Sequence, residues 1–251
     1  MSGTKIHFLG TGDAWHSEGR LHQAILLQLD DECLLVDAGS TVCLSLDRGG
    51  IATAEIDRLF ITHLHGDHIA GWPFLLLRMV FQDERTRPLL ITGPPGTRET
   101  LESLARLCYS DSSLYEKIAF EILYQELPIE ERHAVDCSGI QVDTFPMVHH
   151  ATSLGYVFSC GDSRIGISGD TGWCAGFERL VEASEWLLIE CTTLERAGEK
   201  HLSLEELRAQ AGLFSGKRTF LVHLGAGVAG ALADDPVEGI EAAADGMLIE
   251  A

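Results

Sequence analysis

The chain has 251 residues, of which 45% are hydrophobic and 22% charged, and its formal net charge is −20 at pH 7. This composition excludes a disordered protein and provides enough apolar residues for the core of one large domain. No Lys/Arg-rich stripe interrupts the acidic sequence, so the chain should repel long nucleic acid.

The seven cysteines are odd in number and form no CxxC pair, which indicates neither a disulfide framework nor a zinc ribbon. We expect them to be reduced residues of an intracellular protein. The opening sequence lacks the charged and apolar regions of a secretory signal, and Arg78 interrupts the longest apolar run. The expected location is therefore cytoplasmic. No repeat or linker divides the chain, so residues 1–251 should form a single domain.

Strands and helices are predicted to alternate along the chain. In the first half, apolar runs predict strands at residues 5–9, 24–29, 33–36, 59–62 and 89–92, and helices at 69–81 and 98–108. A turn at residues 30–31 should join the second and third strands as a hairpin.

The second half continues this alternation. Strands are predicted at residues 140–145, 154–159, 164–168, 186–189 and 219–222, and helices at 177–183 and 204–211. Ser203 and Glu206 form a capping-box pattern at the start of the last helix. The sequence therefore predicts an α/β layered domain.

The most informative segment is THLHGDH, which directly follows the apolar stretch LFI. His63 and His65 are two residues apart at the end of an extended segment, so both imidazoles can leave the same side and hold one cation. Gly66 allows a tight turn, after which Asp67 and His68 can hold a second cation. The alternative is a polar surface loop, which rarely contains four such side chains within six residues.

Three further candidate ligands follow predicted strands: His149, Asp170 and His223. Taken singly, each is typical of a hydrogen-bonded structural residue. Together with THLHGDH, they indicate a metal site built from several loops. Imidazole and carboxylate ligands without thiolates suit Zn²⁺, Mn²⁺ or Fe²⁺, and unfilled coordination positions would make the site catalytic.

THLHGDH followed by His149, Asp170 and His223 resembles the metallo-β-lactamase fold superfamily of dinuclear metal hydrolases. The segments FLGTGDA, LLVDAG, SGDTG and LVHL also resemble its pattern. The resemblance implies a four-layer αββα sandwich with two divalent metal ions, first of all Zn²⁺, at one edge. It also suggests a homodimer. By this analogy the first metal is bound by His63, His65 and His149, the second by Asp67, His68 and His223, and both by Asp170.

Several neighbouring residues have open roles. His150 competes with His149 as a ligand, although the spacing from Pro146 favours His149. Asp37 is expected to support the histidine loop rather than touch metal, or to be an ordinary turn carboxylate. Three tryptophans could line the site or pack in the core: Trp15, Trp72 and Trp173.

Within the superfamily the chain looks most like the ribonuclease Z-like phosphodiesterase branch. Glu190 in LLIECT and His201 in HLSLEEL resemble that branch's proton-transfer pair, and Asp67 and Asp170 could orient a metal-bridged hydroxide. Alternatively, Glu190 is a strand-end carboxylate and His201 is part of a network at a helix start.

Two departures argue against a transfer-RNA processing enzyme. Ile189 stands where the branch has histidine, and no Gly/Pro-rich basic arm is inserted. We therefore expect a dinuclear metal-dependent hydrolase whose partner is a small-molecule substrate, a cyclic or short phosphodiester. A lactonase, thioesterase or other acyl hydrolase is the main enzymatic alternative. A non-catalytic metal-binding or carrier protein, or an iron protein with redox chemistry, belongs to another class.

Overall fold

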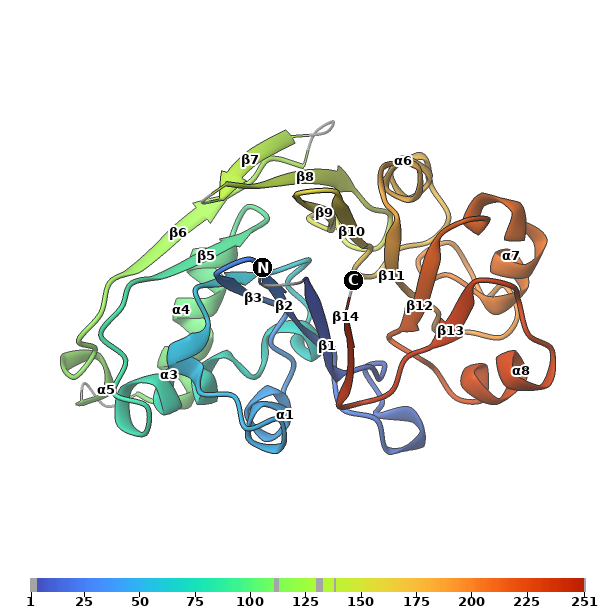
Figure 1. The fold of residues 1–251 in the computed structure, drawn as a ribbon. Helices are drawn as coiled ribbons and strands as arrows, with labels where there is room; N and C mark the ends of the chain where they lie inside the picture. Colours follow the sequence, from blue (N-terminus) through green and yellow to red (C-terminus); the bar gives the residue numbers. More distant parts are fainter. Residues whose placement is uncertain (1–3, 111–112, 130–132, 138, 251) are drawn as a thin grey trace.

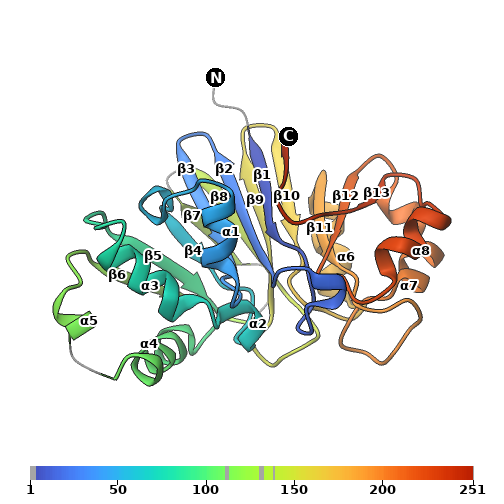
Figure 2. The ribbon, with the colours of Figure 1, turned by 90° about the horizontal axis from the view of Figure 1, so that it is seen from below.

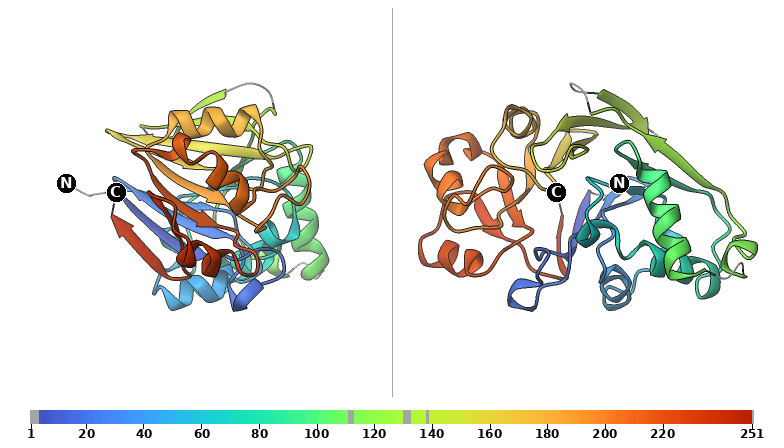
Figure 3. Two further views of the ribbon diagram at one scale, coloured as in Figure 1. Left: turned by 90° about the vertical axis from the view of Figure 1, so that its right-hand side faces the viewer. Right: turned by 180° about the vertical axis from the view of Figure 1, so that it is seen from behind.

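Two seven-stranded sheets face each other, and helices cover their outer surfaces (Figure 1). The structure, a computed structural model, describes residues 4–110, 113–129, 133–137 and 139–250. The two helical layers lie on opposite sides of the paired sheets (Figure 3). This arrangement confirms the predicted αββα sandwich.

The first sheet contains the strands of the first half of the chain together with the last strand. Its first four strands pair antiparallel, and β3 to β6 pair parallel. On its outer face lie α1 (Val42–Arg48), α3 (Trp72–Phe81), α4 (Thr97–Cys108) and α5 (Ser113–Glu116) (Figure 2). The strand order is β14 (Met247–Glu250), β1 (Lys5–Gly10), β2 (Ala24–Leu29), β3 (Glu32–Val36), β4 (Arg58–Phe60), β5 (Leu89–Gly93) and β6 (Ile122–Glu126).

The second sheet is parallel from β10 to β13 and antiparallel from β7 to β10. It is covered by α6 (Ala175–Ala183), α7 (Leu204–Ala209) and α8 (Val228–Asp234). Short 3-10 helices occupy Ser17–Gly19, Thr53–Glu55 and Ala211–Phe214. The strand order is β13 (Ile240–Ala242), β12 (Arg218–Val222), β11 (Trp186–Glu190), β10 (Ser163–Ile167), β9 (Leu154–Cys160), β8 (Ile140–Pro146) and β7 (His133–Cys137).

Three apolar layers hold the sandwich together: one between the sheets and one beneath each helical layer. Aromatic side chains from both sheets meet in the central layer, where Phe60 packs edge-on against Phe158 with ring centroids 5.0 Å apart. Because both faces of a sheet are covered, its inner strands are apolar on both faces, as in β11. A rigid core of this kind fixes the ends of the strands, from which the polar loops extend.

The single helix predicted over residues 69–81 is wrong. The structure has two helices there, the short α2 (Gly66–Ile69) and α3. Pro73 lies in the first turn of α3, and its missing N–H and its ring prevent one continuous helix from running through this point. A Cβ on Gly71 would lie 2.2 Å from the carbonyl oxygen of Gly39, so this break also needs a residue without a side chain. Asp67 and His68 are thereby carried on a separate helical turn.

The other predicted strands and helices are confirmed to within about two residues at each end, including the hairpin between β2 and β3. The capping box is also present, because Ser203 Oγ accepts the Glu206 N–H at 3.2 Å and Glu206 accepts the Ser203 N–H at 3.1 Å. The short helices α1, α5 and α8 and four strands, which are β6, β7, β13 and β14, were not predicted from the sequence.

The described residues contain free thiols and no membrane-spanning helix. Within them, no helix has the length and apolar character needed to cross a membrane. The thiols that the structure describes are free, and they belong to Cys33, Cys43, Cys108, Cys160, Cys174 and Cys191. The side chain of Cys137 lies outside the described part.

Candidate active site

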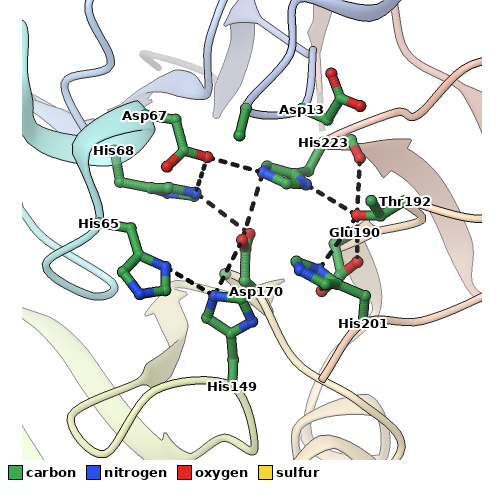
Figure 4. A network of polar contacts seen from close by, with 12 residues as sticks. Asp13, His65, Asp67, His68, His149, Asp170, Glu190, Thr192, His201 and His223 are labelled. Atoms are coloured by element: carbon green, nitrogen blue, oxygen red, sulfur yellow. Dashed lines mark hydrogen bonds and ion pairs between the residues drawn. The ribbon is translucent and has the colours of Figure 1, made fainter. Parts of the chain in front are cut away.

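The predicted ligands come together from loops far apart in the chain, at the carboxyl ends of strands from both sheets (Figure 4). Because β8, β10, β11 and β12 run in the same direction, the residues that follow them meet at one edge. His63 and His65 follow β4, Asp67 and His68 lie in α2, His149 follows β8, Asp170 follows β10, Glu190 ends β11 and His223 follows β12.

The first candidate group consists of His63, His65 and His149, and one ring nitrogen of each lies within 4.8 Å of the others. Their ring centroids are 4.6 to 4.9 Å apart. His150 lies beside this group, with its ring 5.1 Å from that of His65 and its Nδ1 2.9 Å from Thr152 Oγ1. The structure therefore brings His149, rather than His150, into the group.

The second candidate group consists of Asp67, His68, Asp170 and His223, again with one ligand atom of each within 4.8 Å of the others. Asp67 Oδ2 lies 3.2 Å from His223 Nε2 and 3.4 Å from His68 Nε2. Asp170 Oδ1 lies 3.3 Å from His68 Nε2. This set of two carboxylates and two imidazoles matches the ligands expected for the second metal.

Asp170 lies between the two groups. Its Oδ2 is 3.8 Å from His63 Nε2 and 3.7 Å from His149 Nε2 in the first group, and 3.4 Å from His223 Nε2 in the second. A carboxylate in this position can contact both cations, as the resemblance implies.

Unpaired buried atoms show that a cation fits here. Among the described residues, His63 Nε2, His68 Nε2 and Asp170 Oδ1 are buried and lack a hydrogen-bond partner, although His68 Nε2 lies only 3.3 Å from Asp170 Oδ1. A buried polar atom without a partner costs about 1–3 kcal/mol, so three in one place require an explanation. Bound cations would satisfy all three atoms, since each is a lone-pair donor in the form that binds metal.

The histidines of the first group are held in the neutral form that metal binding requires. Burial lowers the pKa of His149 to about 4 and places the pKa of His63 well below its usual range. Burial and the neighbouring His150 also lower the pKa of His65. These imidazoles therefore need to lose no proton before they bind a cation.

In the second group the pKa values of the histidines are raised rather than lowered. Burial disfavours charge on Asp170, but His223, His68 and His63 around it hold its pKa well below the usual range. Burial likewise opposes protonation of His68 and His223, yet Asp170 and the other carboxylates nearby raise both pKa values. The carboxylates of Asp67 and Asp170 give this group the negative charge that attracts divalent cations once its two imidazoles are neutral.

Outer hydrogen bonds orient the candidate ligands. Asp37 is fully buried, and its Oδ2 accepts a hydrogen bond from His68 Nδ1 at 2.8 Å, as expected for a residue that supports the histidine loop. His149 Nδ1 donates to the carbonyl oxygen of Lys200 at 3.0 Å. Asp37 and His223 both have a left-handed backbone, with φ of 61° and 48°, a strained conformation that is common at functional sites.

Glu190 and His201 form the pair that the sequence suggested. Glu190 is buried, and its Oε1 accepts hydrogen bonds from His201 Nδ1 at 2.9 Å and from the Thr171 N–H at 2.7 Å. The His201 side chain is 30% exposed, and its ring lies 4.5 Å from that of His149. Burial would lower the pKa of His201, but Glu190 raises it. His201 thus lies beside both candidate groups, is partly open to solvent and can carry a proton.

The three tryptophans have different surroundings. Trp72 is buried in the core under α3, and the half-buried Trp173 donates its ring N–H to Glu178 at 2.8 Å. Trp15 is 84% exposed, on a loop that Asp13 holds through the N–H groups of Trp15 and Ser17. Trp72 is therefore a packing residue.

Comparisons with known proteins identify the family of the chain. The model of the family described as Anti-Pycsar protein Apyc1 matches residues 4–235. The chain belongs to this family. Among curated proteins, it is 36% identical to a ribonuclease Z of Methanococcus maripaludis over 155 residues, which cover 61% of this chain and 48% of that protein. The family member described here therefore spans about half the length of that relative.

Solved structures extend the likeness to the whole chain. The short form of human tRNase Z superposes with a TM-score of 0.79 and 26% identity, covering 98% of each chain. The metallo-β-lactamase fold protein YhfI of Bacillus subtilis gives a TM-score of 0.77 with 20% identity over both full chains, which shows a shared fold. These likenesses confirm the predicted resemblance to the ribonuclease Z-like branch of the metallo-β-lactamase fold and support a metal-dependent hydrolase.

Proposed function

We propose that the protein is a dinuclear metal-dependent hydrolase that acts on a small phosphodiester. The observation that carries this proposal is the position of Asp170, which stands between two groups of candidate ligands in which three buried atoms lack a hydrogen-bond partner among the described residues. His63, His65 and His149 would hold one cation, Asp67, His68 and His223 the other, and Asp170 both. Imidazole and carboxylate ligands favour Zn²⁺, with Mn²⁺ and Fe²⁺ as alternatives.

The cations, when bound, would lower the pKa of a water molecule and stabilise negative charge on the phosphoryl oxygens. The residues of the chain would supply the proton transfers. Asp67 and Asp170 can orient the attacking water and accept its proton. His201 can donate a proton to the leaving oxygen, because Glu190 favours its protonated form.

The preference for a small substrate rests on charge. A net charge of −20 opposes the approach of a long polyanion, whereas a compact phosphodiester has one charge to place near the cations. The names of the ribonuclease Z relative and of human tRNase Z point the other way, toward RNA. A precursor transfer RNA therefore belongs among the substrates to be tested.

A substrate panel with an Asp67→Ala variant tests this proposal. The zinc-loaded protein should hydrolyse bis(p-nitrophenyl) phosphate or cyclic nucleotides in preference to precursor transfer RNA, lactones, thioesters and a cephalosporin. Asp67→Ala should lower this activity by about 10²-fold or more, because it removes a ligand and an acceptor for the proton of water. Preference for an acyl substrate would refute the substrate class, and an unaffected Asp67→Ala variant would refute the mechanism.

Removal of metal should lower thermal stability. A ligand at 100 times its Kd stabilises the folded state by about 2.7 kcal/mol. For a chain of this size, about 1 kcal/mol corresponds to about 2–4 °C, so chelation should lower Tm by about 5–10 °C. Differential scanning calorimetry with and without EDTA measures this change. A Tm that chelation leaves unchanged in protein shown to contain zinc would contradict the assignment of these groups as the metal site.

A further inference from the structure

Two threonines occupy equivalent positions behind the two candidate metal groups. Thr62 lies between the carboxylate of Asp37 and the ring of His63, in the first group. Thr192 lies between the carboxylate of Glu190 and the ring of His223, in the second. Neither threonine has a role that the sequence predicts, because the residues of each arrangement come together only in the folded chain.

In the first arrangement, Thr62 Oγ1 lies 2.8 Å from Asp37 Oδ2 and 3.1 Å from His63 Nδ1. An ionised carboxylate only accepts hydrogen bonds, so the single hydroxyl proton is donated to Asp37. The hydroxyl oxygen can then only accept from His63, which requires a proton on Nδ1. Nε2 is left with its lone pair, and Nε2 is the buried atom of His63 that has no hydrogen-bond partner within the described ranges.

The second arrangement repeats this pattern. Thr192 Oγ1 lies 2.8 Å from Glu190 Oε2, 3.0 Å from His223 Nδ1 and 3.4 Å from the carbonyl oxygen of His223. The carboxylate is the closer and the charged acceptor, so it receives the hydroxyl proton. His201 Nδ1 is 3.3 Å from the same hydroxyl but 2.9 Å from Glu190 Oε1, and it therefore donates to Glu190.

For His223 the nitrogen left to a cation is also Nε2, although here Nε2 is hydrogen-bonded to a carboxylate, and a cation would replace the proton of that bond. The Nδ1 of His223 donates to Thr192, and its Nε2 faces Asp67 Oδ2 at 3.2 Å and Asp170 Oδ2 at 3.4 Å. Figure 4 shows this arrangement, with Thr192 on one side of the His223 ring and the carboxylates of Asp67 and Asp170 on the other. Glu190 accepts from both Thr192 and His201, so it joins the proton-transfer pair to a candidate ligand of the second metal.

We propose that Thr62 and Thr192 are positioning residues that each fix the Nδ1-protonated tautomer of one metal-binding histidine. His63 and His223 then each have a relay from carboxylate through hydroxyl to imidazole. The inference rests on the two-cation site of the proposed function and adds residues that act on one cation each. Loss of an outer partner of a metal-binding histidine typically weakens metal binding by about 10–100-fold.

The chain offers a matched control for each threonine. Thr193 follows Thr192, and Thr92 lies on β5 beside β4. The Oγ1 atoms of both controls are buried and have no hydrogen-bond partner in the part of the chain that the structure describes. Thr192→Val and Thr62→Val remove the hydroxyl while keeping the shape of the side chain. Thr193→Val and Thr92→Val make the same chemical change where no relay exists. The serine variants Thr192→Ser and Thr62→Ser restore the hydroxyl.

The experiment measures zinc at each site separately. Zinc affinity is obtained by competition with a chelator, and anomalous diffraction from crystals grown with limiting zinc gives the occupancy of each group. Thr192→Val should weaken zinc binding about 10–100-fold at the group containing His223 and leave the group containing His63 occupied. Thr62→Val should weaken zinc binding at the group containing His63 and leave the group containing His223 occupied. The serine and control variants should bind zinc as tightly as the wild type does.

Three results would overturn the inference. Thr192→Val protein with both groups occupied at wild-type affinity would do so while leaving the proposed function intact. If Thr193→Val lost as much zinc affinity as Thr192→Val, the effect would come from packing rather than from the Thr192 hydroxyl. Wild-type protein with zinc at neither group would overturn the inference and the proposed function together. Should Thr62→Val fail to fold, the Thr192 variants decide the matter alone.

Discussion

Asp170→Asn should abolish phosphodiester hydrolysis and reduce the zinc content below two ions per chain. Asp170 has a carboxylate oxygen within 3.8 Å of His63, His68 and His223, so it is the residue shared by both groups. Its removal takes one negative charge from a buried site that must hold two dications. If the stabilisation lost is about 4 kcal/mol, within the several kcal/mol that metal catalysis supplies, the rate falls about 10³-fold.

Zinc analysis and kcat with bis(p-nitrophenyl) phosphate measure this effect. Asp57→Asn is a suitable control, because Asp57 precedes β4 at the end opposite to the site and pairs with Arg87 at 2.7 Å. It should keep both zinc ions and full activity. Asp170→Asn protein with two zinc ions and unchanged kcat would show that this carboxylate does not connect the two sites.

The second large effect is expected for His201→Gln. If His201 donates the proton to the leaving oxygen, its loss should lower kcat by about 10²–10⁴-fold. Zinc content should stay at two ions, because the resemblance assigns His201 to proton transfer rather than to either metal. The loss should be smaller for a substrate with a good leaving group, such as p-nitrophenolate, because such a group needs less protonation. Comparing kcat for an activated and an unactivated phosphodiester measures the difference.

His150→Gln is the matched control for His201→Gln. Both histidines lie next to the first metal group, but His150 bonds to Thr152 and makes no contact with Glu190 among the described hydrogen bonds. The His150→Gln variant should retain near-normal kcat. Loss of one zinc ion in His201→Gln would instead make His201 a ligand, which its distance from His149 and Asp170 permits. Equal kcat in wild type and His201→Gln would place the general acid elsewhere.

The fold was predictable from sequence where strands are buried on both faces, and not at the sheet edges. All four missed strands are edge strands: β14 and β6 in the first sheet, and β13 and β7 in the second. An edge strand has a neighbour on one side and partly exposed side chains, as in β14, so its apolar pattern is weak. The prediction of one helix over residues 69–81 was wrong for a local reason. The apolar periodicity continues through Pro73, but a helical backbone cannot continue through this proline.

The candidate ligands were predictable because their residue types, and their positions directly after predicted strands, can be recognised in the sequence alone. THLHGDH supplies four of them within six residues, and the structure brings His149, Asp170 and His223 to the same place. The residues that hydrogen-bond to these ligands were harder to predict from the sequence. Lys200 acts through its backbone carbonyl, which any residue has, and Thr62 and Thr192 are ordinary strand-end threonines until the histidines beside them are seen.

The most direct test of the account is the zinc stoichiometry of the wild-type protein. Chelated protein titrated with zinc in a calorimeter should bind two equivalents, and crystals grown with that zinc should show one ion among His63, His65 and His149 and another among Asp67, His68 and His223, both next to Asp170. Protein that binds no zinc, or binds it away from these residues, would contradict the central claim that two cations are held side by side at this edge of the sandwich.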